Sequence, residues 1–271
     1  MKKYLIGLGI IILVFILYTG CARQMERLNP FDPGNTIPTS GGGGGGGGSS
    51  DTYTKLLLHM DGVNGSSAFA DSSSYGRAVT ATGATVSTVQ RKFGGASGSF
   101  GTSGGKYLAI PYSSDFVFGS GDFTIDFWYC PLVHGGSYNL QCTNTQDESH
   151  TGWQVLMTDG IALKFAYSTT GIGWAPNVTG SYTFTNSTWY HIAVVRSGNG
   201  IFLFVNGTVL NPGGTAISGS IFDPGYQLVI GQYIGYSSSS TYGANSYIDE
   251  FRISKGVARW TSNFTPPTSA Y

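Results

Sequence analysis

Short stretches in which apolar and polar residues alternate constrain this chain most strongly. In DFTIDFWYC (122–130), Phe123, Ile125 and Phe127 share one face of an extended chain, and the residues between them share the other. The segment TWYHIAVVRS (188–197) is apolar on both faces, which is typical of a central strand that is buried on two sides. Both segments are therefore predicted to be β-strands.

Tight turns join these predicted strands. Asp159-Gly160 and Asn206-Gly207 supply the two positive-φ residues that a two-residue hairpin requires. The last clear strand is predicted at SYIDEFRIS (246–254), and the sequence shows no convincing long amphipathic helix. Strands that recur about every 8–12 residues with glycine-rich turns favour an all-β sandwich of two sheets.

The composition agrees with such a sandwich and excludes one class of partner. Charged residues make up 10% of the chain, against about 25% in an average soluble domain. Low charge with many glycines and aromatic residues suits tight turns and a polar, uncharged surface. The formal net charge is zero, so no positive excess exists to neutralise phosphates, and no nucleic-acid partner is expected.

Residues 1–20 have the layout of an export signal, in which two lysines precede an uncharged apolar run. LYTGC (17–21) resembles the lipobox of bacterial lipoproteins, which implies lipidation of Cys21 and a lipid-anchored, extracytoplasmic place in the cell envelope, at the outer membrane or cell surface. The alternative is an uncleaved membrane anchor. Residues 4–22 carry no charge, and about 18–20 such residues can span a bilayer.

Residues 21–52 are predicted to be a tether. NPFDPGNTIPTS is broken by prolines, and the eight consecutive glycines of residues 41–48 cannot hold a helix or a strand. The folded domain is therefore expected at residues 53–271.

Two cysteines remain once Cys21 is assigned to the lipid. Cys130 and Cys142 flank PLVHGGSYNLQ, and a hairpin that turns near Gly135-Gly136 would place them opposite each other. One expectation is a cross-strand disulfide in an oxidising compartment. The alternative is a pair of free thiols in a β region.

Four segments of the body carry a family resemblance. They are LLLHMDG (56–62), GGKYLAIPYSSDFVFGSGDFTIDFWYCP (104–131), STWYHIAVVRSGNGIFLFVNGTVL (187–210) and YIDEFRISKGVARWTSNFTPP (247–267). With their spacing, they resemble the laminin G-like branch of the concanavalin A-like lectin/glucanase superfamily. The resemblance implies a jelly-roll sandwich of two curved antiparallel sheets. It leaves the function open, because this fold carries lectins, glycanases, adhesion modules and inert spacers.

The acid pattern of the glycan-cleaving relatives is absent from the sequence. Those relatives carry Glu-x-Asp-x-x-Glu on one strand, and hydrolysis needs two carboxyl groups about 5–5.5 or 6.5–9.5 Å apart. The chain has three glutamates, and none stands in that pattern. Asp122 is expected to cap a turn, and Asp126 to face solvent or a cleft. Since no metal-ligand spacing, nucleophile elbow or P-loop is found either, no enzymatic activity is expected.

The resemblance also implies a structural Ca²⁺ beside the first and last strands, which are neighbours in the superfamily. Asp61 in HMDG and Asp249 in YIDEF are the metal candidates on this basis. For Asp61 the alternative is an Asp-Gly turn. For Asp249 it is hydrogen bonding to backbone amides, Arg252 or Arg259.

Strict alternation in the closing strand predicts which residues share a face. One face would carry Tyr247, Asp249, Phe251 and Ile253, and the other Ile248, Glu250 and Arg252. Trp260 and Phe264, in the segment that follows, are expected to hold that segment against the sandwich.

Ligand contacts, if the chain is lectin-like, would come from exposed aromatic rings beside polar side chains. The ligand-binding candidates are Tyr138, Asp147, His150, Trp153, Trp174 and Tyr182. The alternative for the two tryptophans is packing against the sheets, because tryptophan is highly buried on average.

Together these features predict a non-enzymatic binding module that is tethered to the membrane through Cys21. Its ligand would be a glycan or a surface protein, and its role adhesion or capture. The first alternative is a structural spacer or a component of a surface assembly that binds no small ligand. A weaker alternative is a diverged glycan hydrolase.

Overall fold

The computed structural model describes residues 51–271, except 103, 134–138, 148, 175–176 and 233–242. The predicted signal peptide, the lipidation candidate Cys21 and nearly all of the predicted tether lie outside the described residues, as does Tyr138. In the described part of the chain, no helix is long and apolar enough to cross a membrane.

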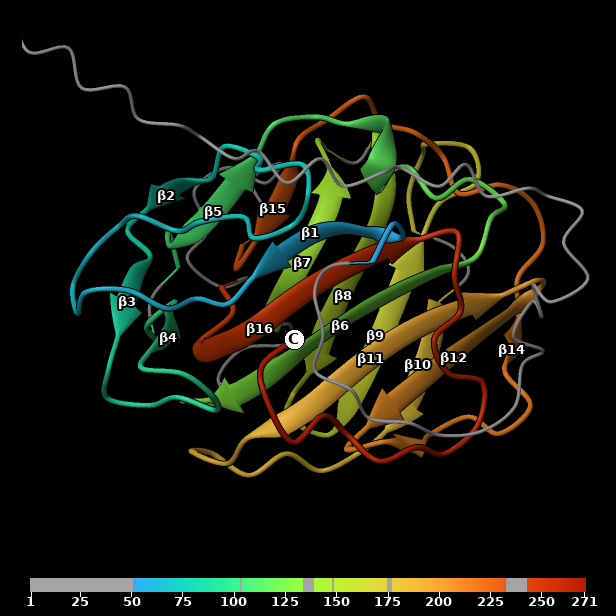
Figure 1. Cartoon of the computed structure of the whole chain (residues 1–271). Helices are drawn as coiled ribbons and strands as arrows, with labels where there is room; N and C mark the ends of the chain where they lie inside the picture. The colour runs from blue at the N-terminus through green and yellow to red at the C-terminus, as the bar shows by residue number, and fades with distance from the viewer. Residues whose placement is uncertain (1–50, 103, 134–138, 148, 175–176, 233–242) are drawn as a thin grey trace, which may run out of the picture. The chain divides into compact units, whose positions relative to one another are not determined.

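Two antiparallel sheets make up the fold (Figure 1). Sheet A has nine strands in the order β13-β12-β11-β6-β16-β4-β3, with β1 paired to β16 and β14 paired to β12. Its strands are β1 (Thr54–Leu58), β3 (Thr85–Ser87), β4 (Ser97–Ser99), β6 (Phe123–Pro131), β11 (Tyr190–Ser197), β12 (Gly200–Val205), β13 (Thr208–Val209), β14 (Thr215–Ala216) and β16 (Ser246–Lys255).

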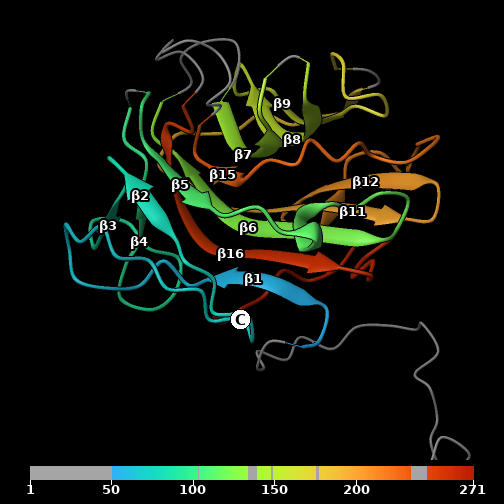
Figure 2. The same cartoon turned by 90° about the horizontal axis from the view of Figure 1, so that it is seen from above.

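Sheet B has seven strands in the order β10-β9-β8-β7-β15-β5-β2. They are β2 (Thr80–Thr82), β5 (Tyr107–Ile110), β7 (Asn139–Thr145), β8 (Thr151–Thr158), β9 (Ala162–Tyr167), β10 (Asn177–Ser181) and β15 (Leu228–Ile230). A short 3₁₀ turn, η1 (Ser114–Phe116), follows β5. Figure 2 shows the two layers, with β16, β6 and β11 in one and β7, β8 and β9 in the other. The predicted two-sheet, jelly-roll sandwich is confirmed.

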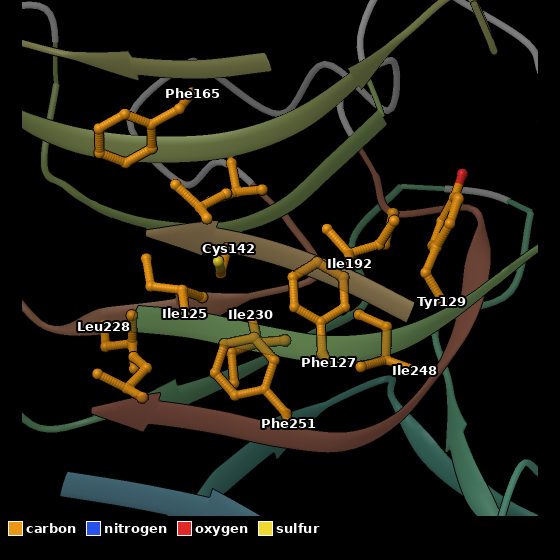
Figure 3. Close-up of a cluster of buried hydrophobic side chains, with 14 of the residues drawn as sticks. Ile125, Phe127, Tyr129, Cys142, Phe165, Ile192, Leu228, Ile230, Ile248 and Phe251 are labelled. Carbon is orange, nitrogen blue, oxygen red and sulfur yellow. The ribbon is translucent and has the colours of Figure 1, made fainter. Parts of the chain in front are cut away.

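The core lies between the two sheets, as the alternation in β6 predicts. Phe123, Ile125 and Phe127 are fully buried and belong to one apolar cluster that includes residues of both sheets. Figure 3 shows side chains of this cluster from both sheets, with Ile125 and Phe127 from sheet A and Phe165, Leu228 and Ile230 from sheet B. Each such side chain contributes about 1.5–3 kcal/mol on burial, so this interface supplies most of the favourable free energy of folding.

Both predicted hairpins are present, with two residues in the loop at Asn206-Gly207 and three at Asp159–Ile161, because Thr158 pairs with Ala162. Asp159 and Gly160 have φ of 48° and 69°, and Asn206 and Gly207 have φ of 49° and 75°. Gly207 is required for a second reason, because a Cβ atom there would overlap the backbone carbonyl of Phe264. The hairpin between β12 and β13 therefore also leaves room for the C-terminal segment.

The C-terminal segment, residues 256–271, covers part of the outer face of sheet A. Ala193 and Val195 of β11 face away from the core, and Trp260 and Phe264 pack against their cluster. The rings of Trp260 and Phe264 are themselves stacked, with centroids 3.9 Å apart. This confirms both the two-sided burial predicted for β11 and the attachment predicted for Trp260 and Phe264.

A β-bulge in β16 overturns the predicted faces of the closing strand. The register with β6 shifts between Asp249 and Arg252, and Glu250 has a φ of 49°. As a result, Ile248 and Phe251 both face the core, although strict alternation would place residues three positions apart on opposite faces. Asp249 therefore does not share a face with Phe251. The pairing of β1 with β16 does confirm that the first and last strands are neighbours.

Of the two expectations for Cys130 and Cys142, the disulfide is wrong, and the pair of free thiols is what the structure contains. Cys130 lies in β6 of sheet A and Cys142 in β7 of sheet B, so the segment between them crosses from one sheet to the other instead of forming a hairpin. Both residues are buried free cysteines. Burial raises the pKa of the Cys130 thiol to about 11 and that of Cys142 further still, which keeps both thiols protonated and unreactive.

Candidate ligand-binding rim

Several loops meet at one end of sheet B because the ends of its strands coincide there. β7 ends at Thr145, which pairs with Thr151 at the start of β8. β9 ends at Tyr167, on the same side of its pairing with β8. β15 begins at Leu228, opposite Ile110 at the end of β5. The connections that leave these positions are consequently neighbours in space.

Hydrogen bonds tie these connections together. The amide of Thr151 donates to the carbonyl of Gly171 at 2.9 Å, and its hydroxyl donates to the carbonyl of Gly173 at 3.0 Å. The amide of Phe222 donates to the carbonyl of Ser168 at 2.9 Å. We call this surface the rim, and its described residues lie in 146–150, 168–174 and 222–226, together with Tyr112.

Tyr112 and Asp223 form the first polar pair on the rim. The Tyr112 hydroxyl donates to Oδ2 of Asp223 at 2.8 Å, while Oδ1 accepts the amide hydrogen of Gly225 at 2.8 Å. The hydrogen bond to the Asp223 carboxylate raises the pKa of Tyr112 above its ordinary value. Because its hydroxyl is held in this way, the Tyr112 ring, which is 46% exposed, is presented to solvent in a fixed orientation.

His150 and Asp147 form the second pair. Nδ1 of His150 lies 2.9 Å from Oδ1 of Asp147, and the same oxygen accepts the amide hydrogen of Ser149 at 2.8 Å. The hydrogen bond from His150 lowers the pKa of Asp147, so this exposed carboxyl group is ionised at neutral pH. The sequence predicted both residues as ligand contacts, and the structure places both on the rim.

Trp174 follows the loop that Thr151 holds. Its side chain is half-buried and packs against Leu156 and Ala166, which lie on the outer face of sheet B. Part of the ring remains exposed on the rim. Trp174, His150 and Asp147 are thus the predicted ligand contacts that the fold brings to one end of the sheet.

Two of the other predicted ligand contacts lie elsewhere. Trp153 is fully buried in the core, where its indole N–H donates to the carbonyl of Phe116 at 2.9 Å, so the prediction that it contacts a ligand is wrong. Tyr182 lies at the opposite end of β10 and packs against Phe184 and Tyr190. It therefore does not join the rim.

The two metal candidates both hold the segment that precedes β4. Oδ1 of Asp61 accepts the amide hydrogens of Gly95 and Ala96 at 2.8 and 2.9 Å. Oδ2 of Asp249 accepts those of Lys92 and Phe93 at 2.7 and 3.1 Å.

These contacts give both carboxylates a structural role. Both oxygens of Asp249 accept amide hydrogens, and Ca²⁺ would require 6–8 oxygen ligands. Among the residues that the structure describes, no group of three or more His, Cys, Asp or Glu side chains could hold a metal ion. Calcium binding therefore stays a prediction. Burial raises the pKa of Asp249 to about 7, against the opposing effect of its amide donors.

A buried ionic group beneath the C-terminal segment was not anticipated. Asp126 is fully buried, not facing solvent or a cleft, and Arg252 bridges both of its carboxylate oxygens at 3.1 and 2.9 Å. The hydroxyl of Tyr271 also donates to Asp126. Burial opposes ionisation of Asp126, but the charge of Arg252 outweighs it and lowers the pKa. Asp122 accepts the amide hydrogen of Gly198 at 2.7 Å, which confirms its role in a turn.

Sequence reasoning also missed Tyr112 and Asp223. They lie 111 positions apart, and only the adjacency of β5 and β15 brings them together. The Asp-Pro-Gly turn at 223–225 was the one local signal, and it indicates a turn without indicating a partner.

Comparison with known proteins identifies the fold. The family described as the concanavalin A-like lectin/glucanases superfamily, in its laminin G form, matches residues 102–261. No curated protein sequence matches the chain.

Solved structures with a similar fold include the following binding domains. The binding domain of the Paraclostridial mosquitocidal protein 1 has a TM-score of 0.58 at 15% identity, over 77% of this chain and 50% of that one. The botulinum neurotoxin serotype D ligand-binding domain, in complex with N-acetylneuraminic acid, has a TM-score of 0.55 at 15% identity, over 76% and 48%. The binding domain of botulinum neurotoxin DC, in complex with rat synaptotagmin II, has a TM-score of 0.54 at 14% identity, over 76% and 49%. The chain spans about half the length of these structures, and at such identities the likeness concerns the fold alone.

Proposed function

Because the chain belongs to the concanavalin A-like lectin/glucanase superfamily, we propose that it is a binding module that holds a glycan at the rim of sheet B. The observation that carries this proposal is the grouping of three accessible rings on tied loops. They are Tyr112, His150 and Trp174, and carboxylates fix the first two.

This arrangement suits the chemistry of a sugar. The C–H face of a pyranose packs against aromatic rings, while its hydroxyl groups need donors and acceptors at defined positions. Asp147 and Asp223 offer carboxylate oxygens beside the rings. Because the Tyr112 and His150 rings are already held by hydrogen bonds, less side-chain freedom is lost on binding than for unconstrained side chains.

A protein ligand is the second candidate, and Ile172 favours it. This side chain is 75% exposed on the same rim, and an exposed apolar residue among aromatic rings suits the centre of a protein interface. The toxin domains with a similar fold have been solved with a sugar and with a protein, which is consistent with either ligand.

The module would be non-enzymatic and tethered. On the rim, the carboxylates of Asp147 and Asp223 are each hydrogen-bonded to a neighbouring ring. This favours a role in positioning those rings over the roles of acid and nucleophile that a glycosidase requires. The lipobox-like LYTGC supports an anchor at Cys21 outside the cytoplasm, from which the module would serve adhesion or capture.

A glycan array probed with the full chain tests the proposal, with two matched variants. Tyr112 and Tyr53 are both 46% exposed, but only Tyr112 lies on the rim. An aromatic contact is worth about 0.5–1.5 kcal/mol, so Tyr112→Ala should weaken binding by roughly two- to tenfold while Tyr53→Ala leaves it unchanged. No binding to any glycan, or equal loss in both variants, would count against the rim and favour the spacer alternative.

A further inference from the structure

The three segments of the rim carry acidic residues but no lysine or arginine. The segments are 146–150 (QDESH), 168–174 (STTGIGW) and 222–226 (FDPGY), and their acids are Asp147, Asp223 and Glu148. Glu148 lies outside the described residues, which leaves Asp147 and Asp223 as the described acids of the rim.

Both aspartates keep acceptor capacity for a ligand. Asp147 uses Oδ1 for Ser149 and His150, and Asp223 uses one oxygen for Gly225 and the other for Tyr112. Each carboxylate oxygen has two lone pairs, so further hydrogen bonds can form. An ionised carboxylate only accepts, and the ligand groups that suit it are therefore hydroxyl or ammonium donors.

The described positive charges near the rim are hydrogen-bonded or lie to one side of it. Beyond Tyr112, Lys255 donates from Nζ to the carbonyl of Ser114 at 2.7 Å, and Arg77 pairs with Asp115. Arg196 is 1% exposed, and its guanidinium donates to the carbonyls of Gly198, Gly119 and Gly219. Lys164 lies on the outer face of sheet B, opposite Leu156, against which Trp174 packs. Lys164 is therefore a cation that the test addresses.

A buried asparagine at the base of the rim connects two of its loops. Asn144 is fully buried and donates from Nδ2 to the carbonyl of Tyr226 at 2.7 Å. Its Oδ1 has no hydrogen-bond partner among the described residues. Because Asn144 is fully buried, it supports the loop at 222–226 from below and leaves ligand contacts to the exposed groups of the rim.

We infer that the ligand of the rim is a neutral glycan that presents hydroxyl donors, and that the rim discriminates against sialylated, uronic or sulfated glycans. This inference rests on the proposed function of the rim. An anionic sugar would place a like charge beside two carboxylates on a surface whose own segments supply no compensating base. A neutral sugar would instead donate its hydroxyl hydrogens to them.

The test is an array of oligosaccharides printed in matched sets, each neutral member beside its sialylated and sulfated forms, probed with the full chain. The neutral member should bind at least about tenfold more tightly than its acidic partners, which corresponds to about 1.4 kcal/mol. The double variant Asp147→Asn/Asp223→Asn should lose most of this discrimination. Asp159→Asn, an exposed acid at the opposite end of β8, serves as the matched control and should retain it.

The outcomes separate the inference from the function beneath it. Binding of acidic members as tightly as neutral ones, or more tightly, overturns the inference but leaves the rim a glycan site. An acidic preference that disappears in Lys164→Gln would identify Lys164 as the cause. A third outcome also overturns the inference. In it, Tyr112→Ala abolishes glycan binding, but the double variant prefers neutral over acidic glycans as strongly as the wild type does. No binding to any sugar overturns the proposed function as well.

Discussion

Arg252 should carry a large share of the stability, because it compensates a carboxylate that has no access to water. Asp126 is fully buried, and Arg252 contacts both of its oxygens while the Arg252 guanidinium lies 3.7 Å from the centroid of the Tyr271 ring. Replacing Arg252 with methionine keeps most of the side-chain volume but leaves the charge of Asp126 without its counter-ion.

The expected cost follows from the geometry. Removing one partner of a buried ion pair costs about 3–5 kcal/mol, against a total stability of about 5–15 kcal/mol for a domain. Asp126 keeps the hydroxyl of Tyr271 as a donor, and His191 lies 3.6 Å away. These remaining contacts place Arg252→Met towards the lower end of that range, near about 3 kcal/mol.

Urea denaturation of the wild type, Arg252→Met, Asp126→Leu and the double variant measures this directly. Since apolar residues of similar volume often replace a buried pair at little cost, the double variant should recover most of the stability lost in Arg252→Met. A loss below about 1 kcal/mol in Arg252→Met, or a double variant no more stable than the single one, would refute the reasoning.

Other parts of the structure give further expectations. Burial raises the pKa of Asp249 from 3.8 to about 7, so folding takes up a proton there. The free energy of unfolding should then fall by up to about 1.4 kcal/mol per pH unit between about pH 4 and 7, relative to Asp249→Asn in parallel urea titrations. Thermal melts of the wild type and Asp249→Asn, in EDTA and with added Ca²⁺, test the calcium prediction. The prediction would fail if Ca²⁺ changes the melting temperature of neither protein. Trp153→Phe should cost about 1–3 kcal/mol in urea, because the carbonyl of Phe116 loses its buried donor. Without reductant, Cys130 and Cys142 should react with Ellman's reagent as two thiols after unfolding and should not react in the folded protein. If they fail to react even after unfolding, the two cysteines form a disulfide after all.

The parts of the fold that local patterns determine were predictable. Alternation placed Phe123, Ile125 and Phe127 in the core, and the positive-φ pairs at Asp159-Gly160 and Asn206-Gly207 fixed both hairpins. In each case the residues that decide the structure are neighbours in the sequence.

The bulge in β16 was not predictable, because distant partners hold it. The carboxylate of Glu250 contacts His59 at 2.9 and 3.0 Å and accepts the amide hydrogen of Tyr271 at 3.0 Å. These contacts help to fix a positive φ that a glutamate adopts only rarely. Alternation alone therefore assigned Asp249 to the wrong face.

The candidate site was predictable only in part, for a related reason. The loops that carry His150 and Trp174 could be recognised as polar, aromatic and rich in turns. That Tyr112 meets Asp223, and that Trp153 points inward, depends on which strands are neighbours and on which face of β8 meets the core. Neither follows from composition or periodicity within one segment.

Hydrogen exchange on the full chain, with and without the tightest glycan from the array, tests the central claim most directly. The account predicts slower amide exchange in the segments 146–152, 168–174 and 222–226, with no change in the C-terminal segment over sheet A. Protection confined to the outer face of sheet A, or to the segment at 88–96, would place the ligand elsewhere and contradict the rim as the binding site.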